Sequence, residues 1–141
     1  MQMKLILLIM ATTVAFAGYV RLAPSHSEHW HVDPIDSSAR VGAGILAEMP
    51  TDLADLDAAV MLSPRVRVLA GSVQDGHITY VARSRVWGFP DYISAKQVGP
   101  NVALYSRQRF GSSDQGVNAG RLLELAGMIG LSPKEVRLKS L

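Results

Sequence analysis

The sequence predicts an α+β domain behind an N-terminal transmembrane helix. The domain is a two-layer sandwich, in which an antiparallel four- to five-stranded sheet carries two helices on one face. Three observations predict it: an apolar N-terminal run, two stretches with apolar residues at helical spacing, and four β-rich runs between them separated by turn residues. The order strand, helix, four strands, helix lets both helices bury their apolar stripes on the sheet. We divide the 141 residues into an anchor or signal segment (1–23), a linker (24–40), the α+β domain (41–131) and a basic tail (132–141).

Composition narrows the functional classes. With 48% hydrophobic and 18% charged residues the chain can bury a core. A net charge of +2, from 14 basic and 12 acidic residues, does not indicate nucleic-acid binding. The absence of cysteine excludes disulfides, thiolate catalysis and Cys-ligated zinc. We predict no cofactor, no catalytic residue and no metal ligand.

The N-terminal segment is uncharged and mostly apolar from Leu5 to Val20, and Arg21 follows it. As a helix these residues would span about 24 Å, against a bilayer core of about 30 Å. Residues 15–17 have the small-x-small form of a signal-peptide cleavage site, whereas Tyr19 followed by Arg21 is typical of an interfacial stop. We expect a retained anchor, with cleavage and export as the alternative.

The remaining elements follow from local patterns. The linker is polar and rich in proline, and we expect no regular element there. Residues 41–47 alternate weakly, as an edge strand would. Thr51 or Asp52 begins a helix that reaches Ser63. Its expected inner residues are Leu53, Leu56, Val60 and Met61.

A four-stranded meander is predicted over residues 65–73, 77–87, 92–98 and 102–110, because only short Gly-, Pro- and Asn-containing turns separate these runs. A final helix should begin at a Ser113 or Asp114 cap and end near Met128. Its expected inner stripe is Val117, Leu122, Leu125 and Ile129.

Arginines are the unusual feature of this sheet, since they occur in three i, i+2 pairs that each share a strand face. With a three-residue turn, Arg67 would face Arg83, and with a two-residue turn Val68 would face Arg83. Like charges directly opposite are unfavourable unless an anion intervenes, so we predict a candidate docking or anion site, with a solvated outer face as the alternative. The six residues are Arg65, Arg67, Arg83, Arg85, Arg107 and Arg109.

The linker carries a second cluster of interest. Trp30, His31 and Asp33 are predicted to dock the linker onto the domain. With His26, Glu28 and His29 they offer nitrogen and oxygen donors suited to zinc, but the spacing fits no standard site. We therefore predict histidines exposed to water rather than a metal centre.

Polar residues also mark the start of the final helix. Asp114, Asn118 and Arg121 share one helix face by their spacing. We interpret Ser113 and Asp114 as a helix cap; an anion site at the helix N-terminus and catalysis involving His77 are the alternatives.

Several spaced motifs lie at residues 81–85, 88–92, 106–107 and 110–118. Together they resemble one known family, the bacterial domain of unknown function 1499, and residues 21–25 and 30–34 are similar to its anchored alphaproteobacterial branch. This family has no assigned reaction, so the resemblance implies a fold and a membrane location but no activity.

We therefore expect a membrane-anchored, non-enzymatic accessory or binding module on the periplasmic side of the bacterial inner membrane. Its expected partners are the membrane, through the run from Leu5 to Val20, and a membrane protein or complex, with no nucleic acid. A domain that binds a lipid or small ligand between sheet and final helix is the alternative. A hydrolase or metal-dependent enzyme is a further, less favoured interpretation.

Overall fold

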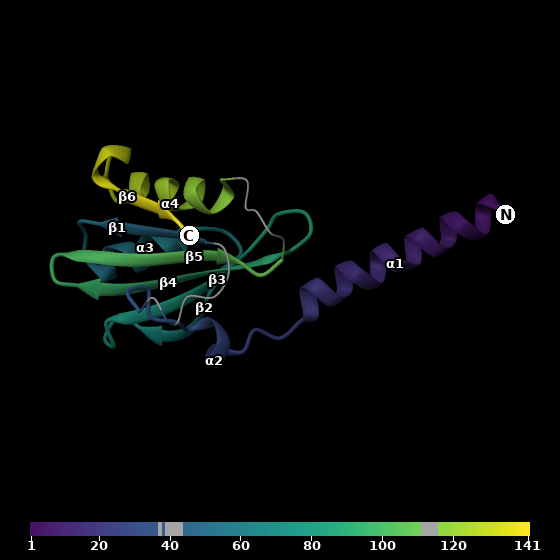
Figure 1. Ribbon diagram of the computed structural model, residues 1–141, viewed down its shortest axis with the longest axis horizontal. Coiled ribbons are helices and arrows are strands. Elements are labelled where there is room, and N and C mark those ends of the chain that lie inside the picture. Colours follow the sequence, from purple (N-terminus) through teal and green to yellow (C-terminus); the bar gives the residue numbers. More distant parts are fainter. Residues whose placement is uncertain (37, 39–43, 111–115) are drawn as a thin grey trace.

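The computed structural model describes residues 1–36, 38, 44–110 and 116–141. It contains one sheet of six strands, and a long N-terminal helix that projects from one end of the domain (Figure 1). The elements are α1 Gln2–Leu22, α2 Ser27–Trp30, β1 Gly44–Met49, α3 Leu53–Leu62, β2 Val66–Ser72, β3 His77–Arg83, β4 Pro90–Val98, β5 Asn101–Gln108, α4 Val117–Met128, the 3₁₀ turn Pro133–Glu135 and β6 Arg137–Ser140.

The sheet confirms the predicted α+β class and the meander β2-β3-β4-β5. Its full order is β2-β3-β4-β5-β1-β6, and every neighbouring pair is antiparallel. The prediction of β1 at an edge was wrong, because residues 137–140, expected as an exposed tail, pair with β1 as a sixth strand. All four residues of β6 remain exposed, as is typical of an edge strand with one neighbour.

Three local boundaries differ from the predictions. Strand β1 runs from Gly44 to Met49, and residues 41–43 lie outside the described part of the chain. Strand β3 ends at Arg83 rather than at residue 87, because the chain turns there: the N–H of Ser84 donates to the Phe89 carbonyl at 2.9 Å, and the Phe89 N–H donates to Ser84 Oγ at 2.9 Å. The linker, predicted to be irregular, contains the single helical turn α2.

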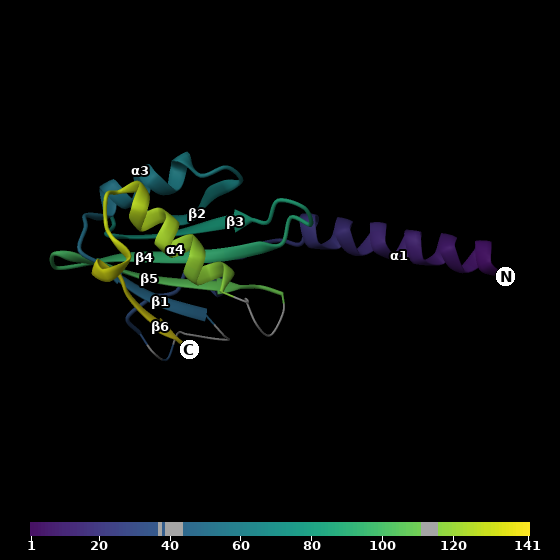
Figure 2. The same ribbon diagram turned by 90° about the horizontal axis from the view of Figure 1, so that it is seen from above.

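The core lies between the sheet and helices α3 and α4, which cover the same face (Figure 2). Two residues that were predicted to face the core are exposed instead: Met61 is 50% exposed and Val117 is 56% exposed.

Helix α4 begins at Val117, after Gly116 at φ +80°, a left-handed conformation that suits glycine. The predicted cap residues Ser113 and Asp114 lie outside the described residues. The side chains that meet in this layer include Leu56, Val60, Ile93, Leu104, Leu122 and Leu125.

The other face of the sheet carries the linker. One end of the domain lies nearest to α1 (Figures 1 and 2). Strands β3 and β5 finish at this end, and strand β4 and helix α4 begin there. We call this the anchor end of the domain. The linker starts there and crosses the sheet: Arg109 donates to the Pro24 carbonyl at 2.8 Å, and further along Asp33 pairs with Lys96 of β4.

Candidate functional site

Trp30 is the centre of the contact between linker and sheet. Its ring stacks on Tyr92 of β4 with centroids 3.8 Å apart, and the Arg107 guanidinium lies 4.5 Å from the ring centroid. Tyr92 and Arg107 are direct neighbours across β4 and β5. Arg107 also donates to the His29 carbonyl at 2.8 Å. A short run of linker is therefore held by an aromatic pair, a cation–π contact and a charged hydrogen bond.

This geometry corrects part of the arginine prediction. Arg107 is 3% exposed and Arg109 is partly buried, so neither presents a free docking surface. Burial lowers the pKa of the Arg107 guanidinium, which still remains charged at neutral pH. Instead of meeting an external partner, these two arginines bind the linker's own carbonyl groups.

His31 extends the same contact. Its Nδ1 lies 2.8 Å from Thr79 Oγ1, and its ring stacks on His77 at 4.0 Å between centroids. His77 Nε2 in turn donates to the Val32 carbonyl at 3.1 Å. Burial, together with the neighbouring His77 charge, lowers the pKa of His31, and burial also lowers that of His77. Both rings therefore favour the neutral form that this packing requires.

Asp33 completes the linker contact through its ion pair with Lys96. Burial alone would raise the pKa of Asp33, but the hydrogen bonds from Lys96 and from the Ile35 N–H outweigh it, and the pKa lies below its ordinary value.

The histidines do not form a metal centre in the part of the chain that the structure describes, where no three His, Asp or Glu side chains gather. His26 and His29 are exposed, whereas His31 is packed against the sheet. His77 is occupied by this linker contact, on the sheet face opposite to α4.

The other four sheet arginines meet Arg21, the last charged residue of α1, at the anchor end. Together they line a hollow of about 500 Å³. We call it the arginine hollow. Its described lining residues are Arg21, Arg65, Val66, Arg67, Val81, Arg83, Ser84, Arg85 and Gly88, which include five arginines and no acidic residue.

The strand register that builds this hollow matches neither predicted alternative. Arg67 lies opposite Val81, and a bulge after Val68 shifts the pairing of β2 with β3. Arg65 and Arg83 hold each other through the backbone: the Arg83 N–H donates to the Arg65 carbonyl at 3.0 Å, and Arg65 Nε donates to the Arg83 carbonyl at 3.3 Å. The turn, which holds the four residues between Ser72 and His77, is longer than predicted, and the turn and the bulge together set this register.

Arg65 has φ +62°, the one positive φ of a non-glycine residue in the described chain. For a residue with a Cβ this left-handed conformation costs about 1–2 kcal/mol. Strain of this kind persists where surrounding structure enforces it, and it clusters at functional sites. Here it places a guanidinium group at the wall of the arginine hollow.

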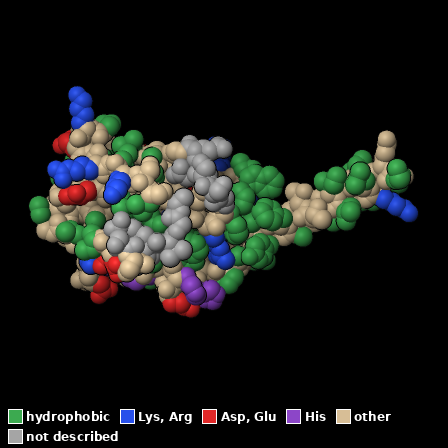
Figure 3. Space-filling view, viewed as in Figure 1, with side chains coloured by type: hydrophobic (Ala, Val, Ile, Leu, Met, Phe, Trp, Pro, Cys, Tyr) green, Lys and Arg blue, Asp and Glu red, His purple; other side chains and the backbone are tan. Residues whose placement is uncertain are grey.

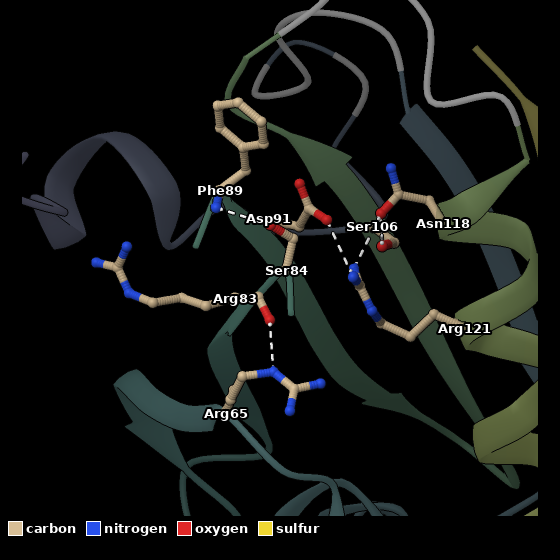
Figure 4. Close-up of polar contacts among 8 residues, drawn as sticks. All are labelled: Arg65, Arg83, Ser84, Phe89, Asp91, Ser106, Asn118 and Arg121. Atoms are coloured by element: carbon tan, nitrogen blue, oxygen red, sulfur yellow. Dashed lines mark hydrogen bonds and ion pairs between the residues drawn. The ribbon is translucent and has the colours of Figure 1, made fainter. Parts of the chain in front are cut away.

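A polar cluster lies just beyond this hollow, beneath the start of α4 (Figure 4). Arg121 pairs with Asp91 at 3.0 Å, and Ser106 Oγ donates to Asn118 Oδ1 at 2.7 Å. Figure 4 shows Arg121 reaching toward Asp91 while the Arg83 side chain points away from it. Ser106 is fully buried, so it is not placed to act as a nucleophile on an external substrate. The sequence placed Asn118 and Arg121 on one helix face but gave no signal of Asp91.

Aromatic residues join α1 to the domain. Phe16 contacts Phe89 with ring centroids 6.2 Å apart, and Tyr19 contacts Phe110 at 6.3 Å. Val20, inside the apolar run, is 1% exposed. Figure 3 shows hydrophobic side chains gathered where the helix meets the domain. The last turns of α1 therefore contact the domain through Val20 and two aromatic pairs, while Phe16 and Tyr19 stay 49% and 57% exposed.

The N-terminal helix has the length and composition to cross a membrane once, with a mean hydropathy of 2.0 over its best window. By these criteria alone α1 is a single membrane span or a signal sequence.

Comparison with known protein families gives a match over most of the chain. The family model described as Protein of unknown function (DUF1499) matches residues 21–128, which confirms the family suggested by the motifs. No curated protein and no solved structure matches the chain.

Proposed function

Because the chain belongs to the DUF1499 family, which has no assigned reaction, its function must be argued from its own geometry, and we propose that it is a membrane-anchored, non-enzymatic binding module. Its anchor end faces the bilayer from the periplasmic side and binds a component of the membrane. The observation that carries this proposal is the contact of the last turns of α1 with the domain, through buried Val20 and the ring contacts of Phe16 and Tyr19.

The junction favours a retained anchor over a cleaved signal sequence. Cleavage after residue 17 would remove Phe16 and its contact with Phe89. It would also separate Val20, which is buried, from the helix that orients it. A cleaved signal sequence does not contribute contacts to the mature fold. A retained anchor helix, in contrast, is held in a fixed orientation by its contacts with the domain.

The linker supports the same orientation. It begins at the anchor end, where Arg109 holds the Pro24 carbonyl, and it is fastened to the sheet again at Trp30 and at Asp33. A linker held along its length cannot act as a long flexible tether. The domain therefore stays close to the bilayer with its anchor end toward the headgroups.

The test uses the full chain with a C-terminal tag, expressed in a bacterial host. We expect the protein to remain in the membrane after an alkaline carbonate wash and to retain the peptide before residue 17, as read by mass spectrometry. Protease added to spheroplasts should digest the domain. Recovery of a soluble protein that starts at Gly18 would refute the anchor, and a domain protected from the protease would refute the orientation.

Binding of a small ligand is a second candidate function. The space for the ligand is smaller than the sequence suggested, because the middle of the layer is filled. The middle of the layer between sheet and α4 is filled by Leu104, Leu122 and Leu125, each at most 2% exposed. A recess of about 350 Å³ lies between α3 and α4 at the anchor end, with Asp91 and Arg121 in its wall. If a small ligand binds there, an Arg121→Gln variant should lose the thermal stabilisation that the ligand gives.

A further inference from the structure

The arginine hollow concentrates positive charge. Among the described residues, no ion pair uses any of its five guanidinium groups and no carboxylate lines its wall. The acidic residues Asp91 and Glu124 line the adjoining recess, which Arg65, Arg83 and Arg85 also border. Like charges around one hollow repel each other, and this repulsion is relieved when an anion enters. Arginine also presents a planar set of N–H donors that matches the oxygens of a phosphate group.

The wall of the hollow is fixed in advance by contacts to the backbone. Arg21 donates to the Val86 carbonyl at 3.0 Å, and Arg83 donates to the Gly88 carbonyl at 2.9 Å. Arg65 is held by Arg83. Each guanidinium has five N–H donors, so these bonds leave further donors for a ligand. Arg67 and Arg85 are exposed and complete the wall.

An apolar hollow adjoins the arginine hollow through a single loop. Gly88 lines the arginine hollow, while its neighbours Trp87 and Phe89 line a second hollow of about 520 Å³. The opposite wall of this second hollow is α1, through Phe16 and the two threonines before it. We call it the helix groove.

The helix groove is suited to a hydrocarbon chain. The Thr12 hydroxyl donates to the Leu8 and Ile9 carbonyls at 3.0 and 2.9 Å, and the Thr13 hydroxyl donates to the Ile9 carbonyl at 2.8 Å. Their hydrogen-bond donors are thus satisfied within the helix, as a lipid environment requires. Phe16 precedes Arg21 by five residues, so the groove extends about 8 Å further into the bilayer than Arg21 does.

We propose that this pair of hollows binds one anionic phospholipid, with its phosphate among the arginines and an acyl chain along the helix groove. The proposal rests on the membrane-anchored orientation proposed above. The exposed side chains of Val86 and Trp87, 71% and 45% exposed, then lie at the level of the headgroups and upper acyl chains.

In the experiment, the purified full chain is mixed with micelles that contain equal amounts of phosphatidylglycerol and phosphatidylcholine. Native mass spectrometry counts the lipid that each protein molecule retains. We expect one retained phosphatidylglycerol, in clear preference to phosphatidylcholine. In the Arg67→Ser/Arg85→Ser double variant, the ratio of retained phosphatidylglycerol to phosphatidylcholine should fall. We expect the ratio to fall about fivefold for each arginine removed, which corresponds to about 1 kcal/mol per charge.

Two matched variants control for charge and folding. Arg137→Ser removes an exposed arginine at the opposite edge of the sheet, and it should leave the lipid preference unchanged. Arg67→Lys keeps the charge but not the paired donors, so it should retain most of the preference even if the double variant fails to fold. Trp87→Ala should lower the retention of both lipids equally.

The result separates this proposal from the proposed function. Equal retention of the two lipids, or an unchanged preference in a folded double variant, would overturn the phospholipid site. Free glycerol 3-phosphate that displaces the lipid at equal concentration would also overturn it, because the acyl chain would then contribute nothing. Carbonate extraction of the same preparations reports the anchor independently, so a membrane-bound protein without lipid preference refutes this inference alone.

Discussion

Trp30→Ala removes the side chain that holds the linker to the sheet. The variant loses the stacking on Tyr92 at 3.8 Å, worth about 1 kcal/mol, and the contact with the Arg107 guanidinium at 4.5 Å, worth about 1–2 kcal/mol for a shielded pair. It also uncovers Tyr92 and Arg107, which are 0% and 3% exposed. We expect the free energy of unfolding to fall by about 2–3 kcal/mol.

Two measurements on the full chain in one detergent check this prediction. The thermal unfolding midpoint should fall by roughly 10 °C. Amide hydrogen exchange should accelerate selectively in residues 24–36, because a released linker exposes its backbone while the sheet stays folded. Trp87→Ala is the matched control: it removes the same side chain from an exposed loop and should cost about 1 kcal/mol or less. Equal midpoints for the two variants, with unchanged linker exchange in Trp30→Ala, would refute this account of the linker.

Three further predictions concern the domain. Asp91→Asn leaves the guanidinium group of Arg121 without a counter-charge in a largely buried pair, and chemical denaturation should show the free energy of unfolding lowered by about 2–3 kcal/mol. A decrease below about 0.5 kcal/mol would contradict a stabilising role of this ion pair. Because the pKa values of His31 and His77 are lowered in the fold, their packing stabilises the domain fully above the ordinary value of 6.5 and less as the pH falls through the lowered values. The protection of the linker amides, expressed relative to the intrinsic exchange rate at each pH, should thus decrease from pH 7.5 to 5.5, and a variant with glutamine at both positions should lose this pH response. Finally, Gly71→Ala would place a Cβ 2.1 Å from the His77 carbonyl oxygen and should unfold at least 5 °C below Gly76→Ala, whose new Cβ meets no atom within 4 Å; equal midpoints would show that the backbone of β2 relaxes.

The anchor end combines features that lie far apart in the chain. Arg21 belongs to α1, Arg65 and Arg67 to the entry and body of β2, and Arg83 to the end of β3. Figure 2 shows the loop between β3 and β4 reaching the base of α1. A phospholipid held there would tie the domain to the bilayer through a second contact besides the proposed anchor, and would fix its rotation about the helix axis.

The arginine pattern shows how far a sequence argument reaches. The i, i+2 spacing identified three pairs on the strands, but it treated all six residues as one surface. In the fold, Arg107 and Arg109 hold the linker, and the other four line the arginine hollow. Which arginine does which depends on strand register, and a bulge after Val68 set a register that the turn residues did not indicate.

Periodicity and the apolar run were sufficient for the parts that depend on neighbours in the chain. They determined the α+β class, the four-stranded meander, both domain helices and the apolar N-terminal helix, because alternation and helical spacing report local burial. Trp30 was identified in the same way, as an aromatic residue in an otherwise polar linker.

Contacts between distant segments were decided only by the tertiary structure. The pairing of β6 with β1, the Asp91–Arg121 ion pair and the stacking of His31 on His77 each join segments at least 30 residues apart. No local pattern encodes such a partner, because the free energy of the contact depends on which surfaces the packed core brings together. The sequence by itself therefore determined the layers and the apolar N-terminal helix, and the tertiary structure decided that arginines without an ion-pair partner among the described residues gather where that helix enters the domain.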